Sequence, residues 1–159
     1  MCCQMKPTSD CVVKVPASSA ACKTGVHNFD GAVAAVQRLS DTTFGFAIQL
    51  DDPASQSFLP GQYMNVQIPG TELTRAYSFS SPPGAAQAEF VVRNVPGGRM
   101  SGWLGEQAKV EERIRISGPY GSFYLRPVQR PVLFLAGGTG LALIGAITSN
   151  VVAAMEQPE

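Results

Sequence analysis

The sequence has few charged residues, and their signs cancel. Charged residues make up 15% of the chain, against roughly 25% in typical globular proteins. The formal net charge at pH 7 is zero. A chain without a basic excess lacks the electrostatic attraction that holds proteins to nucleic acid. The composition therefore predicts neither nucleic acid nor an acidic surface as a partner.

The N-terminus lacks an apolar stretch of signal-peptide length, so we expect a cytoplasmic protein with reduced thiols. The cysteines match neither the C-x4-C-x2-C…C spacing of a plant-type two-iron cluster nor a zinc-site spacing. They are Cys2, Cys3, Cys11 and Cys22. Taken alone, they favour free thiols over a metal site.

Turn-forming residues are plentiful: the chain has 16 glycines and 12 prolines, spread without an internal repeat. This composition is typical of short elements joined by many turns, as in a barrel or a sandwich. The 159 residues allow one domain with a substantial core and are too few for two complete domains.

From His27 onward, short alternations of apolar and polar residues predict β-strands separated by turns. The expected strands are 42–50, 62–68, 89–95 and 113–117. Residues 118–123 are expected to form a tight turn before the last barrel strand. No long helical pattern lies between these segments, which favours an antiparallel barrel.

The stretch 74–81 is the first candidate binding site, and we expect it to be a strand that ends in a loop. The two-residue period of a strand places Arg75 and Tyr77 on one face. A guanidinium can grip a pyrophosphate while the phenol ring stacks on a flat heterocycle, which suits a flavin dinucleotide. Ser78 would reach a ring nitrogen only if the strand bends. The alternative is a surface arginine and a half-buried tyrosine on an ordinary sheet.

A second candidate site follows the strand at 89–95, where a glycine-rich turn leads into a short helix. The N–H groups at a helix N-terminus bind anions, and Gly98 would let a phosphate come close. The alternative is a capped surface helix, with Ser101 in its first turn and with Trp103 and Leu104 packed on the barrel.

The pattern changes after Arg130. A continuous apolar run at 131–136 predicts a buried parallel strand, and a glycine turn and a helical pattern follow it. This is the opening of a dinucleotide-binding βαβ unit, although the turn is not GxGxxG. Residues 132–155 carry no charge and are long enough to span a bilayer, but the glycine turn would break such a helix. We therefore expect a half-built domain with an exposed apolar patch, and no membrane span.

Taken in order, five motifs resemble the ferredoxin–NADP reductase superfamily: Arg75-Ala76-Tyr77-Ser78, Val91-Val92-Arg93-Asn94, Gly98-Arg99-Met100-Ser101, Gly118-Pro119-Tyr120-Gly121 and Gly137-Gly138-Thr139-Gly140. The resemblance is closest to the reductase component of benzoate-type aromatic-ring dioxygenases, because residues 3–11 also resemble the end of that family's two-iron ferredoxin domain. The resemblance covers nearly the whole chain up to Leu141.

The resemblance implies a mainly β fold: an antiparallel Greek-key FAD-binding barrel with one short helix at 27–128. Residues 129–159 would be the first strand, turn and helix of a truncated α/β domain that binds NADH. Residues 1–26 would be the C-terminal remnant of the ferredoxin domain and a linker.

The resemblance also implies residue roles. Arg75 would hold the FAD pyrophosphate, Tyr77 would stack on the isoalloxazine, and Ser78 would bond near the flavin N5. The implied FAD contacts are Arg75, Ala76, Tyr77, Ser78, Val91, Val92, Arg93, Gly98, Arg99, Met100 and Ser101. The implied nicotinamide contacts are Gly137, Gly138, Thr139 and Gly140, and the implied catalytic residues are Tyr77, Ser78 and Thr139.

Cys3 resembles the fourth ligand of the family's two-iron cluster. The other three ligands would lie upstream of Met1, so we expect no 2Fe-2S cluster in this chain. The family's glycine turn usually continues as Ala-Pro, whereas here Leu141 and Ala142 follow.

The implied function is transfer of electrons from NADH through FAD towards an iron–sulfur centre and the oxygenase component of an aromatic-ring dioxygenase. We expect truncation to impair it. The alternatives are a non-catalytic flavin-binding module that works with a second chain, and an unstable fragment.

Overall fold

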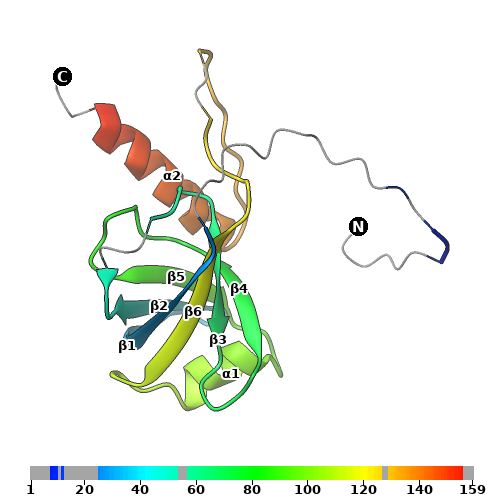
Figure 1. Ribbon diagram of the computed structural model, residues 1–159, viewed down its shortest axis with the longest axis vertical. Coiled ribbons are helices and arrows are strands. Elements are labelled where there is room, and N and C mark those ends of the chain that lie inside the picture. The colour runs from blue at the N-terminus through cyan, green and yellow to red at the C-terminus, as the bar shows by residue number, and fades with distance from the viewer. Residues whose placement is uncertain (1–7, 11, 13–24, 54–56, 127–128, 156–159) are drawn as a thin grey trace.

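The computed structural model describes residues 8–10, 12, 25–53, 57–126 and 129–155 (Figure 1). Within them the chain forms six β-strands and two α-helices. The strands are β1 (His27–Ser40), β2 (Thr43–Leu50), β3 (Tyr63–Gln67), β4 (Thr74–Ser78), β5 (Ala88–Arg93) and β6 (Arg113–Tyr120). The helices are α1 (Arg99–Glu106) and α2 (Gly140–Met155).

All strand pairs are antiparallel, in the sheet order β4-β3-β6-β1-β2-β5. An isolated bridge between Phe79 and Phe90 brings the extension of β4 to β5 and closes the sheet into a barrel. The connection through α1 returns the chain between β1 and β3, as in a Greek key. The predicted barrel is therefore confirmed.

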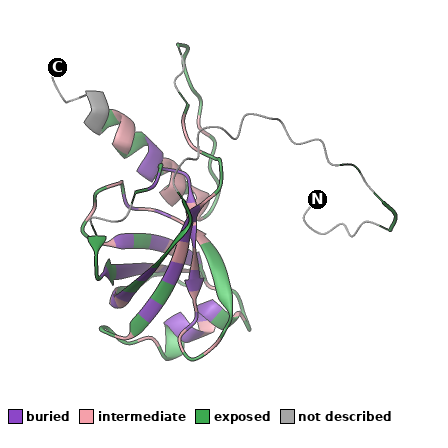
Figure 2. Cartoon of the chain, in the orientation of Figure 1, coloured by how far each residue is buried: buried purple, intermediate pink, exposed green. Residues whose placement is uncertain are grey.

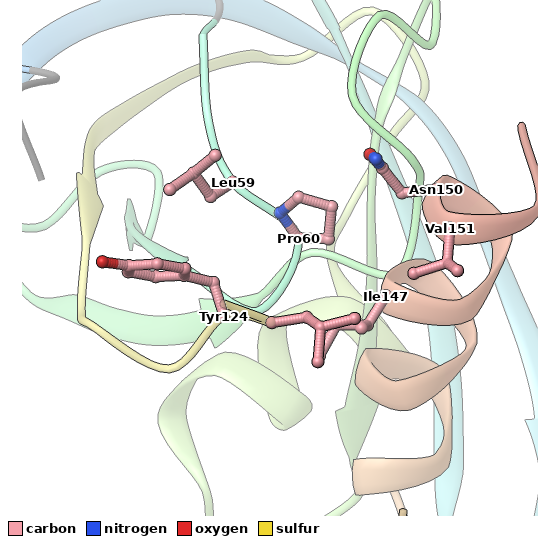
Figure 3. A pocket seen from close by; sticks show the side chains of 7 residues that line it. Leu59, Pro60, Tyr124, Ile147, Asn150 and Val151 are labelled. Atoms are coloured by element: carbon pink, nitrogen blue, oxygen red, sulfur yellow. The ribbon is translucent and has the colours of Figure 1, made fainter. Parts of the chain in front are cut away.

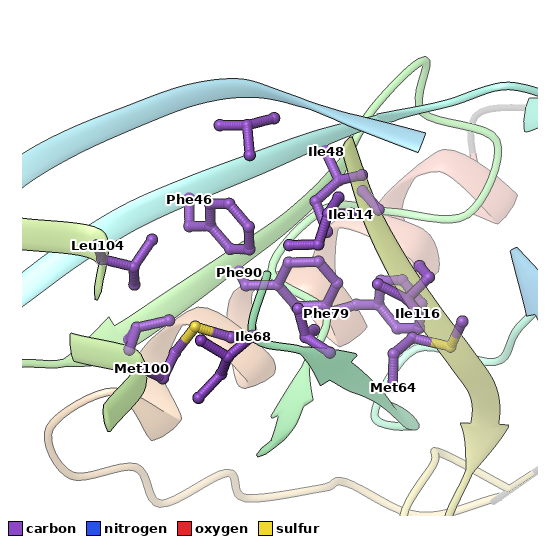
Figure 4. Packing of buried hydrophobic residues seen from close by; sticks show 14 of the residues in the cluster. Phe46, Ile48, Met64, Ile68, Phe79, Phe90, Met100, Leu104, Ile114 and Ile116 are labelled. Carbon is purple, nitrogen blue, oxygen red and sulfur yellow. The ribbon is translucent and has the colours of Figure 1, made fainter. Parts of the chain in front are cut away.

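The barrel interior is built by the alternation that the sequence shows (Figure 2). In β2, for example, Phe44, Phe46, Ile48 and Leu50 are all buried, while Gln49 between them is exposed. Figure 4 shows Ile48, Met64, Phe79 and Phe90 meeting in the core from four segments of the barrel wall. Burying each such side chain stabilises the fold by about 1.5–3 kcal/mol.

A series of aromatic contacts crosses this core. Phe58 stacks on Phe79 with ring centroids 3.7 Å apart, and Phe79 contacts Phe90 at 5.4 Å. Phe46 then links Phe90 to the edge of Trp103 on α1. Trp103 is therefore a packing residue that fixes α1 to the barrel.

Two expected strands are not formed in the described part of the chain. β6 continues through 118–120 rather than ending in a tight turn, and no strand follows Phe123. The expected buried strand at 131–136 is an extended segment with Leu133 83% and Leu135 84% exposed. Among the described residues, no neighbouring strand satisfies its backbone groups, as a buried parallel strand requires.

Helix α2 has only two fully buried side chains in its described part, Ala146 and Ile147. In Figure 1 it stands beside one end of the barrel and extends away from it. No helix in the described residues is long and apolar enough to cross a membrane.

Candidate functional site

Strand β4 presents the first candidate residues in the predicted arrangement. Arg75 pairs with Val66 and Tyr77 with Met64, so both lie on the face of the sheet that carries the core residues of β3. Arg75 is exposed, whereas Tyr77 is half-buried against the hydrophobic core. Ser78 pairs with Tyr63 and faces the other way.

The environment of Tyr77 keeps its phenol neutral. Burial raises the pKa of Tyr77 above its usual value of 10.0, and the positive charge of Arg75 offsets this only in part. A neutral phenol keeps an uncharged ring face for stacking. The Arg75 guanidinium donates a hydrogen bond to the Thr74 carbonyl at 2.8 Å.

The start of α1 combines features of both interpretations. As expected for a capped surface helix, Trp103 and Leu104 are buried. The Ser101 hydroxyl donates to the Val95 carbonyl at 2.9 Å and accepts from the Val95 N–H at 3.1 Å. However, no side chain caps the helix at Gly98. An anion site requires such an uncapped start, because the free N–H groups are then available to the anion.

Gly98 is required by packing within the protein. A Cβ at this position would lie 2.6 Å from the Ser101 hydroxyl and 2.9 Å from the Val95 carbonyl. The Ser101 hydroxyl is therefore engaged with the loop before α1, and the groups left for a phosphate are the backbone N–H groups of the first turn.

A cavity of about 350 Å³ lies where β4, β5 and the start of α2 meet. It gathers seven of the sequence-predicted residues, from parts of the chain far apart in sequence: Ala76, Tyr77, Ser78, Val91, Arg93, Thr139 and Gly140. The other predicted residues, apart from Cys3, do not line it: Arg75, Val92, Gly98, Arg99, Met100, Ser101, Gly137 and Gly138. Val92 and Met100 are core residues, 1% and 2% exposed.

Sequence reasoning missed three residues of the cavity wall: Val95, Ala142 and Leu143. Val95 ends the segment predicted as a strand, and the other two begin the helix after the glycine turn. The position of this turn was the available signal, because the first residues of a helix that follows a ligand-binding turn commonly face the ligand.

A separate cavity of about 340 Å³ lies between the turn at Leu59 and Pro60, Tyr124, and the α2 residues Ile147 and Val151 (Figure 3). Its wall is mainly apolar and holds none of the predicted residues. Cys3 lies outside the described residues. Within those that are described, no group of histidine, cysteine, aspartate and glutamate side chains is arranged to hold a metal ion.

Comparison with known proteins identifies the class of this barrel. Residues 30–124 match the family described as the oxidoreductase FAD-binding domain. The match covers more than half of the chain, and the chain therefore belongs to this family.

Individual relatives are more specific. The chain is 46% identical over 149 residues to the toluate 1,2-dioxygenase electron transfer component of Pseudomonas putida, with 94% of this chain and 44% of that protein covered. It is 49% identical over 140 residues to the 2-halobenzoate 1,2-dioxygenase electron transfer component of Burkholderia cepacia, with 88% and 41% covered.

A solved structure, the ferredoxin reductase in carbazole 1,9a-dioxygenase, superposes with a TM-score of 0.74 at 31% identity and covers 84% of this chain and 41% of its own. These matches confirm the predicted resemblance. The chain spans less than half the length of these relatives.

The residues present fit FAD, which the family membership supports as cofactor. The cavity borders a neutral, half-buried tyrosine ring, which suits a flat heterocycle. The exposed Arg75 guanidinium and the N-terminus of α1, which has no side-chain cap, lie outside the cavity wall and are donors of the kind that bind a pyrophosphate.

Proposed function

We propose that this chain is the FAD-binding part of a cytoplasmic electron-transfer reductase, which takes electrons from NADH and passes them towards an iron–sulfur centre and an aromatic-ring dioxygenase. The observation that carries the proposal is the cavity in which Tyr77 and Ser78 of β4 meet Val91 and Arg93 of β5 and Thr139. The names of the relatives support the choice of partner.

In this proposal, residues 27–128 hold FAD, residues 129–159 begin an NADH-binding domain, and residues 1–26 belong to a ferredoxin domain and a linker. FAD, when bound, can accept a hydride and release single electrons. The Tyr77 ring would stack on the flavin, Ser78, at the border of the same cavity, would bond near its N5, and Ala76 and the main chain of residues 91–93 would line it.

Three groups of residues would serve the two nucleotides. Arg75 and the first-turn N–H groups of α1, from Gly98 to Ser101, hold the FAD pyrophosphate. Residues 137–140 hold the nicotinamide nucleotide, and Thr139 lies nearest to the path of the hydride. The position of Thr139 and Gly140 in the same cavity as Tyr77 supports this assignment.

We expect this 159-residue chain to turn over little NADH by itself. Hydride transfer needs the nicotinamide held against the flavin ring, and the segment 131–136 forms no sheet on which a nucleotide could rest. This observation favours a second function, a flavin-binding module that works with another chain. Stopped-flow reduction of bound FAD by NADH, without and with a chain that supplies the remaining domains, separates the two functions.

The first test is the visible absorption spectrum of the protein after FAD is added and the excess removed. We expect a flavin band to stay with the protein. We expect Arg75→Ala to weaken FAD binding roughly 10- to 150-fold, because a charge-assisted hydrogen bond contributes about 1.5–3 kcal/mol.

A matched control is Arg38→Ala, which removes an exposed arginine of β1 that pairs with Asp41. It should leave the flavin band unchanged. A soluble, folded wild-type protein that retains no flavin would overturn the proposed function.

A further inference from the structure

Gln62 is a fully buried polar side chain directly before β3, with 0% of its surface exposed. A buried amide is costly unless its donors and acceptors are hydrogen-bonded. Its Oε1 accepts a hydrogen bond from the Leu59 N–H at 2.8 Å, and its Nε2 donates to the Gly121 carbonyl at 3.1 Å. The side chain therefore joins two loops that are 59 residues apart.

The first of these loops is a tight turn that Gln62 closes twice. Besides the side-chain bond, the Gln62 N–H donates to the Leu59 carbonyl at 3.0 Å. Pro60 and Gly61, with φ of 107° at the glycine, occupy the positions that a type II turn gives to proline and glycine. The turn lies directly against the second loop, because a Cβ at Gly61 would be 2.0 Å from the Phe123 carbonyl.

This turn connects to the flavin site through one stacked pair. Phe58 precedes the turn and stacks on Phe79 with ring centroids 3.7 Å apart and planes 10° apart. Phe79 directly follows Ser78, and its N–H donates to the Gln62 carbonyl at 3.4 Å. The end of β4 is therefore held by Gln62 and by the loop that Gln62 fixes.

The end of β4 is also paired with β3, where Ser78 lies opposite Tyr63 and Tyr77 opposite Met64. Towards β5 it is held by the Phe79–Phe90 bridge, by the bond from the Ser80 N–H to the Glu89 carbonyl at 2.8 Å, and by the Ser81 hydroxyl, which accepts from the Glu89 N–H at 3.1 Å. Tyr77 and Ser78 line the cavity on that side. Release of the loop at 58–62 would remove the stack and the hydrogen bond that it makes with Phe79, and the end of β4, with Tyr77 and Ser78, could then shift relative to β5.

We propose that Gln62 is a positioning residue for the flavin site: its amide fixes the turn at 59–62, and through the Phe58–Phe79 stack it sets the orientation of Tyr77 and Ser78. The role rests on the proposed function, because it deepens the same site. Gln62 itself does not line the cavity.

The test uses two substitutions. Gln62→Met keeps the length of the side chain and removes both amide bonds. Gln62→Glu keeps the acceptor for Leu59, but it can donate to the Gly121 carbonyl only when its carboxyl is protonated. Burial raises the pKa of a carboxyl, so this variant should recover its donor as the pH falls.

We expect Gln62→Met to weaken FAD binding about tenfold or more and to change the visible circular dichroism of the bound flavin. Gln62→Glu should behave like Gln62→Met at high pH and return towards the wild-type spectrum at lower pH. Leu50→Ala is the control: it removes a buried side chain of β2 that pairs with Gly31 of β1. It should lower stability and leave the flavin spectrum unchanged.

The proposal is overturned if Gln62→Met keeps the wild-type affinity and spectrum, or if Leu50→Ala changes both as much at an equal loss of stability. If Gln62→Met does not fold, the pH series of Gln62→Glu decides alone, and no return towards the wild-type spectrum overturns the proposal.

If the wild type retains no FAD, the proposed function fails separately. Hydrogen exchange in the FAD-free protein then decides the role of Gln62. Faster exchange at the Leu59 and Phe79 amides in the Gln62 variants than in Leu50→Ala supports it, and equal exchange overturns it.

Discussion

The barrel at 27–120 and the segment at 129–155 are both rich in apolar residues, but they bury them to very different extents. Phe79, Phe90 and Ile48 of the barrel are at most 1% exposed. Leu133 and Leu135, of similar hydrophobicity, are more than 80% exposed. Apolar sequence alone therefore does not build a core. Each barrel strand buries its apolar face because neighbouring strands satisfy its backbone, and in the described part of the chain residues 131–136 have no such neighbour.

The largest expected difference between the two regions is the cost of removing an apolar side chain. Phe90→Ala should lower the free energy of unfolding by about 3–5 kcal/mol, because it leaves a cavity among packed aromatic rings. Leu135→Ala should change it by no more than about 0.5 kcal/mol. Urea unfolding of both variants checks this, and equal losses would contradict the comparison.

The next effect concerns two glycines with positive φ, one in each region. Gly61 has φ of 107° and Gly138 has φ of 57°. A left-handed alanine costs about 1–2 kcal/mol at either position. Only at Gly61 would the new methyl also meet a carbonyl, that of Phe123, which adds about 1–3 kcal/mol of overpacking.

Thermal unfolding of Gly61→Ala and Gly138→Ala measures the difference. We expect the melting temperature to fall clearly further for Gly61→Ala. If the melting temperature of Gly138→Ala falls as far, the segment at 129–155 is packed more tightly than its open surroundings indicate.

A smaller effect on stability, with a larger one on solubility, is expected for the exposed apolar segment. Replacing Leu133 and Leu135 together by serine should change the free energy of unfolding by no more than about 0.5 kcal/mol. It should raise solubility, because exposed apolar patches promote association. Deletion of 132–159 should raise solubility further, and unchanged solubility in both cases would mean that another surface governs association.

The smallest expected effect is the pH dependence caused by Tyr77. Burial raises the pKa of its phenol in the folded protein. Its contribution to stability is therefore fully present below the unfolded-state pKa of about 10 and is lost as the pH rises through the higher folded-state value. Tyr77→Phe should lose less stability than the wild type between pH 8 and pH 11, as measured by urea unfolding at both values.

Much of the barrel could be predicted from period-2 alternation, because its inward residues are large and apolar. β2 and β6 began where the pattern placed them, within one residue. The first strand was harder to predict, because it carries small residues such as Ala32 and Ala35, and its register shifts between Val33 and Ala35. That irregularity removes the period on which such predictions depend.

At the candidate site, motif order identified residues that the fold brings to one cavity, including Tyr77 and Thr139. It did not identify Gln62, because nothing local marks a glutamine as buried. Its partners Leu59 and Gly121 are brought together only by the closed barrel. The exposure of 131–136 could likewise not be predicted from the sequence, because the same apolar run forms a buried strand wherever neighbouring strands are present.

The closure of the barrel by a single bridge has a consequence for aggregation. From Thr74 to Ser78, β4 is paired with β3 on one edge, and no described strand pairs with its other edge. An open strand edge is a template on which a further chain can add. A ligand in the cavity beside Ala76, Tyr77 and Ser78 would cover this edge, so occupancy of the site would protect the protein from fibre-like self-association.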